Sequence, residues 1–221
     1  MIYLDHNATT PLDERVKKTM SDAFGIFGNP SSSHAFGLEA RAAIENARSR
    51  TARLIGCRPD EIIFTSGGTE ANNIAIIGTA YRKGKGHIIA SAVEHPSVMN
   101  PVRWLSGRGF DVTLIPVDSA CIVNQYEVKR ALRHDTILIT IMHSNNETGS
   151  LQPITEVGKI AKEYGIAFHT DAAQSIGKMP VYADSLLADM ITVVPHKFYG
   201  PKGVGALYIK GFGQNARHIP N

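Results

Sequence analysis

The chain contains 221 residues, of which 43% are apolar, and it carries a formal net charge of +3. This length and apolar content allow a sizeable buried core, and they predict one large domain or at most two small ones. Basic residues are scattered among acidic ones, so the sequence offers no continuous basic surface, which excludes nucleic acid and an anionic membrane as expected partners.

The first sixty residues differ in pattern from the rest of the chain. Residues 1–60 combine an extended start, a stretch rich in Gly, Asn, Pro and Ser over 25–33, and an amphipathic helix over 38–54. We expect an N-terminal arm and a connecting helix that leads into the next region.

From residue 61 to residue 213, short β-branched runs alternate with helical patterns. Seven runs have the composition of buried strands: 61–65, 87–91, 111–115, 137–141, 166–170, 190–194 and 205–209. Helical spacing occurs over 69–79, 98–105, 126–132 and 154–164, the last opened by Pro153 in its first turn. The pattern predicts an α/β domain with a mostly parallel mixed sheet of about seven strands and helices on both faces. The run 205–209 follows its neighbour too closely for a crossover helix, so we expect it to be antiparallel.

Cysteine and histidine usage predicts neither disulfides nor a metal site. Cys57 and Cys121 lie far apart and outside any C-x-x-C pair. The nine histidines show no short metal-ligand spacing. The chain also shows no leader pattern and no apolar run long enough to cross a bilayer, so we expect a soluble, cytoplasmic protein.

The segment Ser66-Gly67-Gly68-Thr69-Glu70 turns from a predicted strand into a predicted helix. Exposed backbone N–H groups and the helix dipole would meet there, which suits a phosphate group. Tight turns need glycine regardless, so an ordinary turn stays an open interpretation. The segment is neither a G-x-x-x-x-G-K-[ST] loop nor a G-x-G-x-x-G fingerprint, which disfavours a nucleotide.

Other polar residues follow the predicted strands at the edge where ligands of parallel sheets collect. His95, in Glu94-His95-Pro96-Ser97, either stacks on a flat cofactor or caps the helix that follows. The polar turn over 145–149 either supplies an amide to a ligand or is an ordinary turn, since Asn and Gly are common turn formers.

Asp171 and Lys197 follow the fifth and sixth predicted strands. A buried carboxylate is costly unless a cation pairs with it, and a protonated pyridine nitrogen is such a partner. A lysine at this edge can have its pKa lowered by desolvation and become nucleophilic, whereas a lone loop lysine is usually only solvated. Because an anion cradle, a carboxylate and a lysine all follow strands at one edge of the sheet, the sequence favours a nucleophilic Lys197 in a ligand site over a solvated loop lysine.

Seven stretches match one known family, in its order, along nearly the whole chain up to about Gly213. They are residues 3–11, 28–32, 64–73, 94–95, 145–149, 171–174 and 196–203. In these stretches the chain resembles the cysteine desulfurase and selenocysteine lyase family, within the class V aminotransferase group of pyridoxal-phosphate enzymes. The resemblance implies the large-domain fold of the pyridoxal-phosphate transferases, with pyridoxal 5'-phosphate as cofactor.

The resemblance also implies a role for individual residues. Lys197 would form the Schiff base with the cofactor and take part in catalysis together with His95, which stacks on the pyridine ring and shuttles protons. The other implied roles are phosphate binding by Gly68, Thr69 and His196, pairing of Asp171 with the ring nitrogen, contact of Gln174 with the phenolic oxygen, a place for Asn146 near that oxygen and the substrate carboxylate, and a place for Asn7 at the edge of the substrate pocket.

The implied reaction removes sulfur or selenium from cysteine or selenocysteine and leaves alanine. The freed Lys197 takes the α-proton, and the chalcogen passes to an acceptor thiol, which can belong to a partner protein. Members of the family form homodimers. Another class V activity, such as an aminotransferase or a kynureninase-like lyase, fits the matched stretches less well.

The chain departs from the family pattern in two respects. Many cysteine desulfurases have serine where Val194 stands, and valine is closer to the selenocysteine lyases. Family members also continue into a smaller C-terminal domain with an arginine for the substrate carboxylate and a sulfur-accepting cysteine, whereas residues 214–221 resemble a divergent tail. Neither Cys57 nor Cys121 matches that cysteine, so the rival hypothesis is a fragment that binds the cofactor without turnover.

Overall fold

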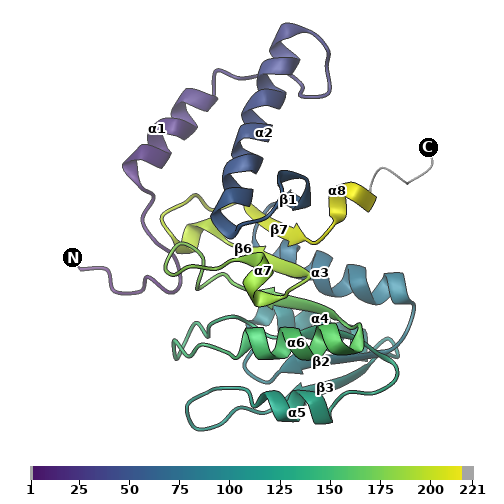
Figure 1. Ribbon diagram of the computed structural model, residues 1–221. Helices are drawn as coiled ribbons and strands as arrows, with labels where there is room; N and C mark the ends of the chain where they lie inside the picture. The colour runs from purple at the N-terminus through teal and green to yellow at the C-terminus, as the bar shows by residue number, and fades with distance from the viewer. Residues whose placement is uncertain (1, 216–221) are drawn as a thin grey trace.

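The computed structural model describes residues 2–215, and a seven-stranded mixed sheet lies at its centre, with strand order β1-β7-β6-β5-β4-β2-β3 (Figure 1). The strands are β1 (Ile62–Thr65), β2 (His87–Ser91), β3 (Asp111–Ile115), β4 (Thr136–Thr140), β5 (Ala167–Asp171), β6 (Met190–Val193) and β7 (Gly205–Ile209). The α/β prediction is confirmed, and each strand lies within about one residue of its predicted bounds.

Strand direction gathers most of the strand ends at one edge. β3, β2, β4, β5 and β6 pair in parallel, whereas β7 lies antiparallel between β6 and β1. The prediction of an antiparallel seventh strand is therefore confirmed. Because β1 is antiparallel to β7, it runs in the same direction as β6. The carboxyl ends of β1 to β6 consequently point to one edge of the sheet, where ligands of such folds bind.

Helices cover both faces of the sheet, as predicted. They are α1 (Glu14–Ala23), α2 (Ala35–Ile55), α3 (Gly68–Lys83), α4 (Pro96–Ser106), α5 (Gln125–Arg130), α6 (Ile154–Tyr164), α7 (Ala183–Leu186) and α8 (Phe212–Asn215), with short 3-10 turns η1 (Pro59–Glu61) and η2 (Pro195–Lys197). Pro153 is the N-cap of α6 rather than a residue of its first turn.

Two apolar layers hold these helices to the sheet. Along β2, Ile88 packs in the layer with α3 and α4, while Ile89 packs in the opposite layer with α5 and α6. Leu138 and Ile139 of β4 divide in the same way. Both faces of these strands are buried, which explains why their sequences are continuous apolar runs without polar alternation. Each such side chain contributes about 1.5–3 kcal/mol of burial free energy.

The expectation of an extended start missed helix α1. This helix buries none of its residues, and its few apolar side chains, Val16, Met20 and Ala23, stand in a mostly charged and polar sequence. Local interactions form it instead: Asp13 caps its first turn by accepting from Arg15 N (2.8 Å), and Lys18 pairs with Asp22 one turn later (2.9 Å). With the outer part of α2, α1 forms an arm that rises above the sheet (Figure 1).

The segment before α1 lies against the turn that follows β6. Thr10 N donates to the carbonyl oxygen of His196 (2.9 Å), and Tyr199 N donates to Thr10 Oγ1 (2.6 Å). Asp13 N donates to the carbonyl oxygen of Tyr199 (3.1 Å). The N-terminal segment thus reaches the edge of the sheet where the strand ends gather.

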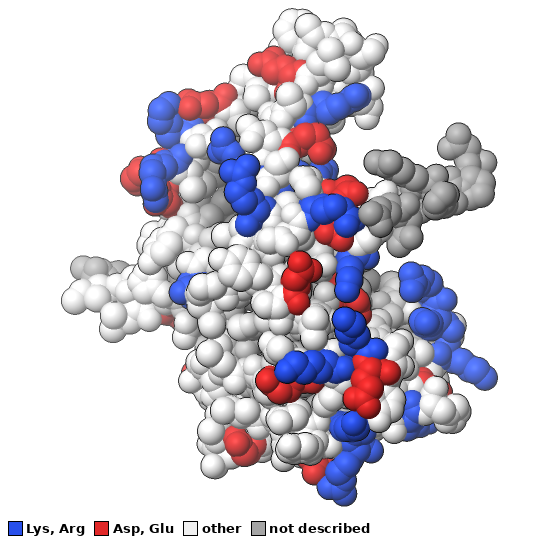
Figure 2. Space-filling view, viewed as in Figure 1, with Lys and Arg blue, Asp and Glu red and all other residues white. Residues whose placement is uncertain are grey.

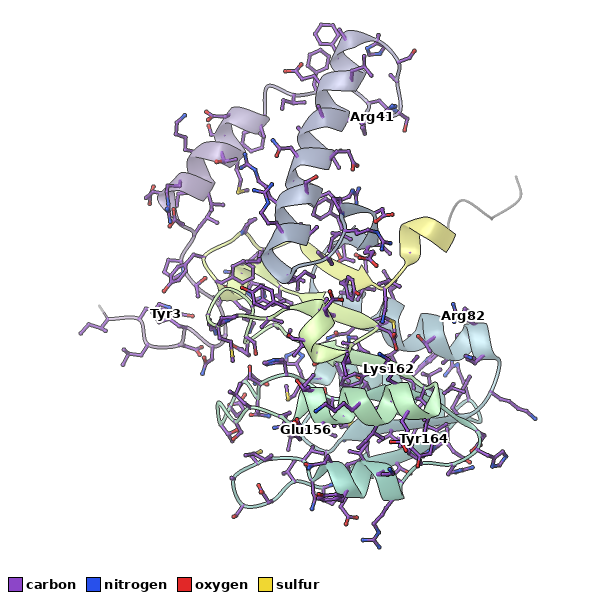
Figure 3. All side chains as sticks on the ribbon, viewed as in Figure 1. Tyr3, Arg41, Arg82, Glu156, Lys162 and Tyr164 are labelled. Carbon is purple, nitrogen blue, oxygen red and sulfur yellow. The ribbon has the colours of Figure 1, made fainter. Side chains whose placement is uncertain are left out.

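The surface carries mixed charge over the face shown in Figure 2, where basic and acidic side chains intermingle. Glu156, Lys162 and Tyr164 are exposed along α6 (Figure 3). Within residues 2–215, no helix has both the length and the apolar content that crossing a bilayer requires. The division into regions 1–60, 61–213 and 214–221 stays a prediction, and residues 216–221 of the expected tail lie outside the described residues.

Candidate active site

A cavity of about 270 Å³ lies where the carboxyl ends of the strands meet. Eight of the nine residues singled out from the sequence line it: Gly68, Thr69, His95, Asn146, Asp171, Gln174, His196 and Lys197. Ala8, Ser97, Met142, Ser144, Ala173 and Val194 complete the lining. Its volume is near the lower end of the ~300–1,000 Å³ typical of small-molecule sites. The fold therefore brings together residues from the N-terminal segment and from the ends of β1, β2, β4, β5 and β6.

The start of α3 forms one wall of the cavity. The helix begins at Gly68, and no side chain among the described residues caps its first turn. A Cβ on Gly68 would lie 2.6 Å from Cγ2 of Val194, so only glycine fits this contact. The helix start is thus close to the end of β6, and its N–H groups are available to an anion.

Asp171 ends β5 and is buried, with 6% of its surface exposed. Its Oδ2 accepts a hydrogen bond from Asn72 Nδ2 (2.8 Å), and its Oδ1 accepts one from Ala173 N (3.0 Å). These donors orient the carboxylate, but they carry no positive charge. A cationic ligand in the cavity would supply the charge partner that a buried carboxylate needs.

Lys197 ends η2, directly after β6, and is half-buried. Its Nζ donates to the carbonyl oxygens of Asn7 (2.6 Å) and Ala8 (2.9 Å). Burial lowers the pKa of Lys197 below its ordinary value, and the nearby ammonium of Lys178 lowers it further. A larger fraction of this amine is therefore unprotonated, which is the nucleophilic form.

His95 caps α4, one of the two interpretations left open by the sequence, and it also faces the cavity. It is the N-cap of α4, where its Nδ1 accepts from Ser97 N (3.1 Å), and its ring also lines the cavity. The segment 145–149 forms a turn, as one interpretation expected, and it also borders the cavity. Asn145 accepts from the backbone N–H groups of Glu147 and Thr148 and so forms the turn, while Asn146 lines the cavity.

Asn7, which we expected at the edge of the substrate pocket, contacts residues of the cavity lining through its main chain. The side chain is exposed and is not part of the lining, whereas the backbone oxygen accepts from Lys197 and from Gln174 Nε2 (2.9 Å). Gln174 Oε1 in turn accepts from Lys178 Nζ (2.7 Å). Asn7 is thus connected to the cavity through its main chain, which residue type alone does not reveal.

Val194 and His196 both lie between the end of β6 and Lys197. His196 Nδ1 is 3.1 Å from Thr9 Oγ1, and burial together with Lys197 lowers the pKa of this histidine. The buried Val194 has no polar atom to offer an anion, as the sequence predicted.

Glu94 precedes His95 in the chain and is buried, but it is not part of the cavity lining. Its Oε1 accepts from Ser91 Oγ (2.5 Å) and Met142 N (2.8 Å), and its Oε2 has no hydrogen-bond partner among the described residues. Burial raises the pKa of Glu94 to about 8. This side chain is therefore mostly a neutral acid near pH 7.

Both cysteines are free thiols outside the cavity, in agreement with the sequence expectation that they form no disulfide. Burial raises the pKa of Cys57 to about 12, which makes it a poor nucleophile.

Three uncharged polar residues at or next to the cavity were not predicted from the sequence. Ser97 and Ser144 line it, and Asn72 holds Asp171. For Asn72 a signal existed in the sequence, because it lies one helical turn after Gly68 and so shares its helix face.

The chain belongs to the aminotransferase class-V family, whose model matches residues 2–219. A cysteine desulfurase IscS from Dictyoglomus turgidum is 55% identical over 213 residues, which are 95% of this chain and 54% of that protein. A putative cysteine desulfurase IscS 1 from Bacillus subtilis is 51% identical over 210 residues, 94% of this chain and 55% of that protein. The chain thus spans about half the length of these curated relatives.

Among solved structures, one described as SspA in complex with cysteine matches with a TM-score of 0.92 at 43% identity. The match covers 99% of this chain and 63% of that chain. Proteins of the class-V family and its cysteine desulfurases depend on pyridoxal 5'-phosphate, so the resemblance identified in the sequence is confirmed at the level of family and fold.

Proposed function

We propose that the cavity binds pyridoxal 5'-phosphate and that the chain is the cofactor-binding part of a cysteine desulfurase, which removes sulfur from cysteine and leaves alanine. One observation carries the proposal: the Lys197 amine, the Asp171 carboxylate and the start of α3 all line one cavity. These groups match an aldehyde, a pyridine nitrogen and a phosphate in turn. Because one small cofactor carries all three, the residues present fit it.

The phosphate would bind at the N–H groups of Gly68 and Thr69, with His196 beside them. Asp171 would face the pyridine nitrogen, and Lys197 would hold the cofactor covalently. When bound, the cofactor supplies an electron-withdrawing pyridine ring that stabilises negative charge on the substrate carbon atoms. Gln174 and Asn146 line the same space and would supply amide contacts.

Lys197 has the properties of the base that takes the α-proton of the substrate. Its lowered pKa increases the fraction of free amine, and a base works best with a pKa near the working pH. In its place in η2, Nζ already has hydrogen-bond acceptors in Asn7 and Ala8, so the protonated amine that forms is also stabilised. This lysine would therefore serve both in attachment and in proton transfer.

His95 would lie on the ring and move protons through Nε2, because its Nδ1 is engaged with Ser97. Asn7 would lie at the pocket edge through its main chain. These residue roles are proposals that the shared cavity supports.

Cysteine is the proposed substrate, because the relatives named above are cysteine desulfurases and the solved relative SspA is described in complex with cysteine. Val194 favours selenocysteine only weakly, so selenocysteine is the alternative substrate. A sulfur-accepting partner, a homodimer and a cytoplasmic location stay predictions.

Trapping the cofactor tests the proposal directly. The chain is incubated with pyridoxal 5'-phosphate, reduced with borohydride and analysed by mass spectrometry after digestion. We expect label on Lys197, and an absorption band near the visible edge that is absent from Lys197→Ala. Lys202→Ala, which changes an exposed lysine close by in sequence, is the matched control and should keep both signals. A chain that stays colourless, or label on Lys202 instead, would contradict the proposal.

Turnover is tested separately with the 221-residue chain, cysteine and selenocysteine, following alanine together with sulfide or selenide. Alanine formation that Lys197→Ala abolishes would support desulfurase chemistry. Label on Lys197 without alanine would favour the rival hypothesis, in which this chain binds the cofactor without turnover.

A further inference from the structure

The side-chain amide of Asn72, in α3, is fully buried and makes three side-chain hydrogen bonds. Its Nδ2 donates to Asp171 Oδ2 and to Ser97 Oγ, both at 2.8 Å. Its Oδ1 accepts from Thr192 Oγ1 (2.6 Å). Both N–H bonds and the oxygen of one amide are therefore used, and they join three separate elements, β5, α4 and β6, to α3.

The orientation of this amide follows from its partner. A carboxylate only accepts hydrogen bonds, so the group that faces Asp171 must be the NH₂ end of Asn72. A flipped amide would bring two oxygens together at 2.8 Å. The second N–H then points to Ser97, and the carbonyl oxygen points to Thr192.

Thr192 extends this chain of donors away from the cavity. Since its hydroxyl hydrogen is given to Asn72, Thr192 Oγ1 must accept from His169 Nε2 (3.1 Å). His169 Nδ1 then accepts from Thr140 Oγ1 (2.8 Å). Burial lowers the pKa of His169 to about 3, so the ring is neutral near pH 7 and has one N–H, as this arrangement requires.

Ser97 continues the chain toward the cavity. Its Oγ accepts from Asn72, which leaves the hydroxyl hydrogen free for His95 Nδ1 at 2.7 Å. The backbone N–H of Ser97 points at the same nitrogen (3.1 Å). Nδ1 therefore has two donors, and in the neutral ring the proton of His95 resides on Nε2.

We propose that Asn72 is a positioning residue that couples Asp171 to His95: one amide orients the carboxylate and, by donating to Ser97, directs the Ser97 hydroxyl hydrogen to Nδ1 of the histidine. Each group in this network donates a hydrogen bond to the next, from Thr140 to His169, from His169 to Thr192 and from Thr192 to Asn72. Asn72 then donates to Asp171 and also to Ser97, which donates to His95. The functional meaning of both ends rests on the proposed function, but the coupling itself is a property of this chain.

The position of Asn72 explains why an amide is needed there. Asp171 requires a donor, Thr192 requires an acceptor and Ser97 requires a second donor, and only an amide side chain of this length offers all three. Asn72 also lies on the helix that begins the phosphate cradle at Gly68. One helix would thus place the anion site and, one turn later, the group that orients the two residues facing the ring.

The test replaces Asn72 with the isosteric acid and reads the ring nitrogens of His95. In Asn72→Asp, a carboxyl oxygen takes the place of Nδ2, 2.8 Å from Asp171, so the two acids share one proton. The same oxygen accepts from the Ser97 hydroxyl, whose hydrogen is then no longer given to His95. His95 Nδ1 keeps the backbone N–H of Ser97 but loses the hydroxyl donor, so we expect its ¹⁵N resonance to shift in the cofactor-free chain. Asn73→Asp is the matched control, with the same change one residue along α3, where Asn73 only donates to Thr69 O and is partly exposed. It should leave His95 unchanged.

The affinity for the cofactor tests the hydrogen bond between Asn72 and Asp171. In Asn72→Asp the shared proton weakens the negative charge that Asp171 offers the cofactor, so the dissociation constant of pyridoxal 5'-phosphate should rise about 10-fold or more, and about twofold at most in Asn73→Asp. Ser97→Ala removes the hydroxyl that donates to His95 Nδ1 and should shift the same ¹⁵N resonances without any change at position 72.

A second measurement applies if Asn72→Asp does not fold. Asp171→Asn should move the His95 resonances in the wild-type background and leave them in place in the Ser97→Ala background. His95 resonances that ignore both Asn72→Asp and Asp171→Asn would overturn the coupling, whatever the chain binds. Failure of the wild-type chain to bind the cofactor would instead count against the proposed function alone.

Discussion

The ammonium group of Lys197 donates a hydrogen bond to the backbone oxygen of Asn7, 190 residues earlier in the chain, at 2.6 Å. A second bond joins the same nitrogen to Ala8. The proposed reactive lysine therefore also anchors the N-terminal segment at the mouth of the cavity.

Removing this anchor should loosen the segment. In Lys197→Met both bonds are lost while the apolar stem is kept, so we expect faster amide hydrogen exchange over residues 5–10. The measurement is exchange followed by mass spectrometry on the cofactor-free chain. Lys202→Met, at an exposed lysine, should exchange like the wild type, and equal protection in all three chains would show that Lys197 does not hold the segment.

Lys178 should tune the reactivity of Lys197. Its charge is the second cause, after burial, of the lowered pKa of Lys197. Lys178→Gln removes that charge, so the pKa of Lys197 should rise and its acylation by a small reagent should need a higher pH. Lys178→Arg keeps the charge and should keep the wild-type profile. Site-resolved mass spectrometry across pH gives both midpoints, and identical midpoints for the two variants would refute the charge effect.

Glu94 should make stability fall as the pH rises. Burial raises its pKa from an ordinary value of 4.5 to about 8, so the folded chain binds this proton more tightly than the unfolded chain. The stability from this group is complete below pH 4.5 and is lost as the pH passes through 8. Glu94→Gln, which cannot ionise, should therefore gain stability over the wild type at high pH, on the order of a few kcal/mol. Urea unfolding of both chains at several pH values measures the difference, and a constant difference would contradict the assignment.

Gly68 should tolerate no side chain unless its neighbour is shortened. A Cβ there would meet Val194 Cγ2 at 2.6 Å, so Gly68→Ala should displace the start of α3 and cost about 1–3 kcal/mol of stability. The affinity for pyridoxal 5'-phosphate should fall with it. In the Val194→Ala background the same change should cost much less, because the clashing methyl group is gone.

Gly78 provides the control on the same helix. A Cβ at Gly78 meets nothing within 4 Å, so Gly78→Ala should stabilise the chain by about 1 kcal/mol through helix propensity. Thermal unfolding with and without cofactor compares the variants. A Gly68→Ala chain as stable and as tightly binding as Gly78→Ala would refute the packing argument.

Much of the site was predictable from the sequence because strand ends in a parallel sheet share one edge. His95, Asp171 and Lys197 each follow an apolar run, and that placement alone predicted their convergence. The network around Asn72 was not predictable in the same way. An asparagine in a helix pattern gives no sign that Thr192, Ser97 and Asp171 surround it, because those contacts join residues far apart in the chain.

The sequence by itself determined the strands, most of the helices and the antiparallel seventh strand, because apolar periodicity and connection length are local properties. It missed α1, which is stabilised by a cap and an ion pair and not by burial. Only the tertiary structure decided the strand order, the main-chain contact of Asn7 with Lys197 and the donor chain through Asn72. These depend on long-range packing, in which a buried polar group must find its partner wherever the fold places one.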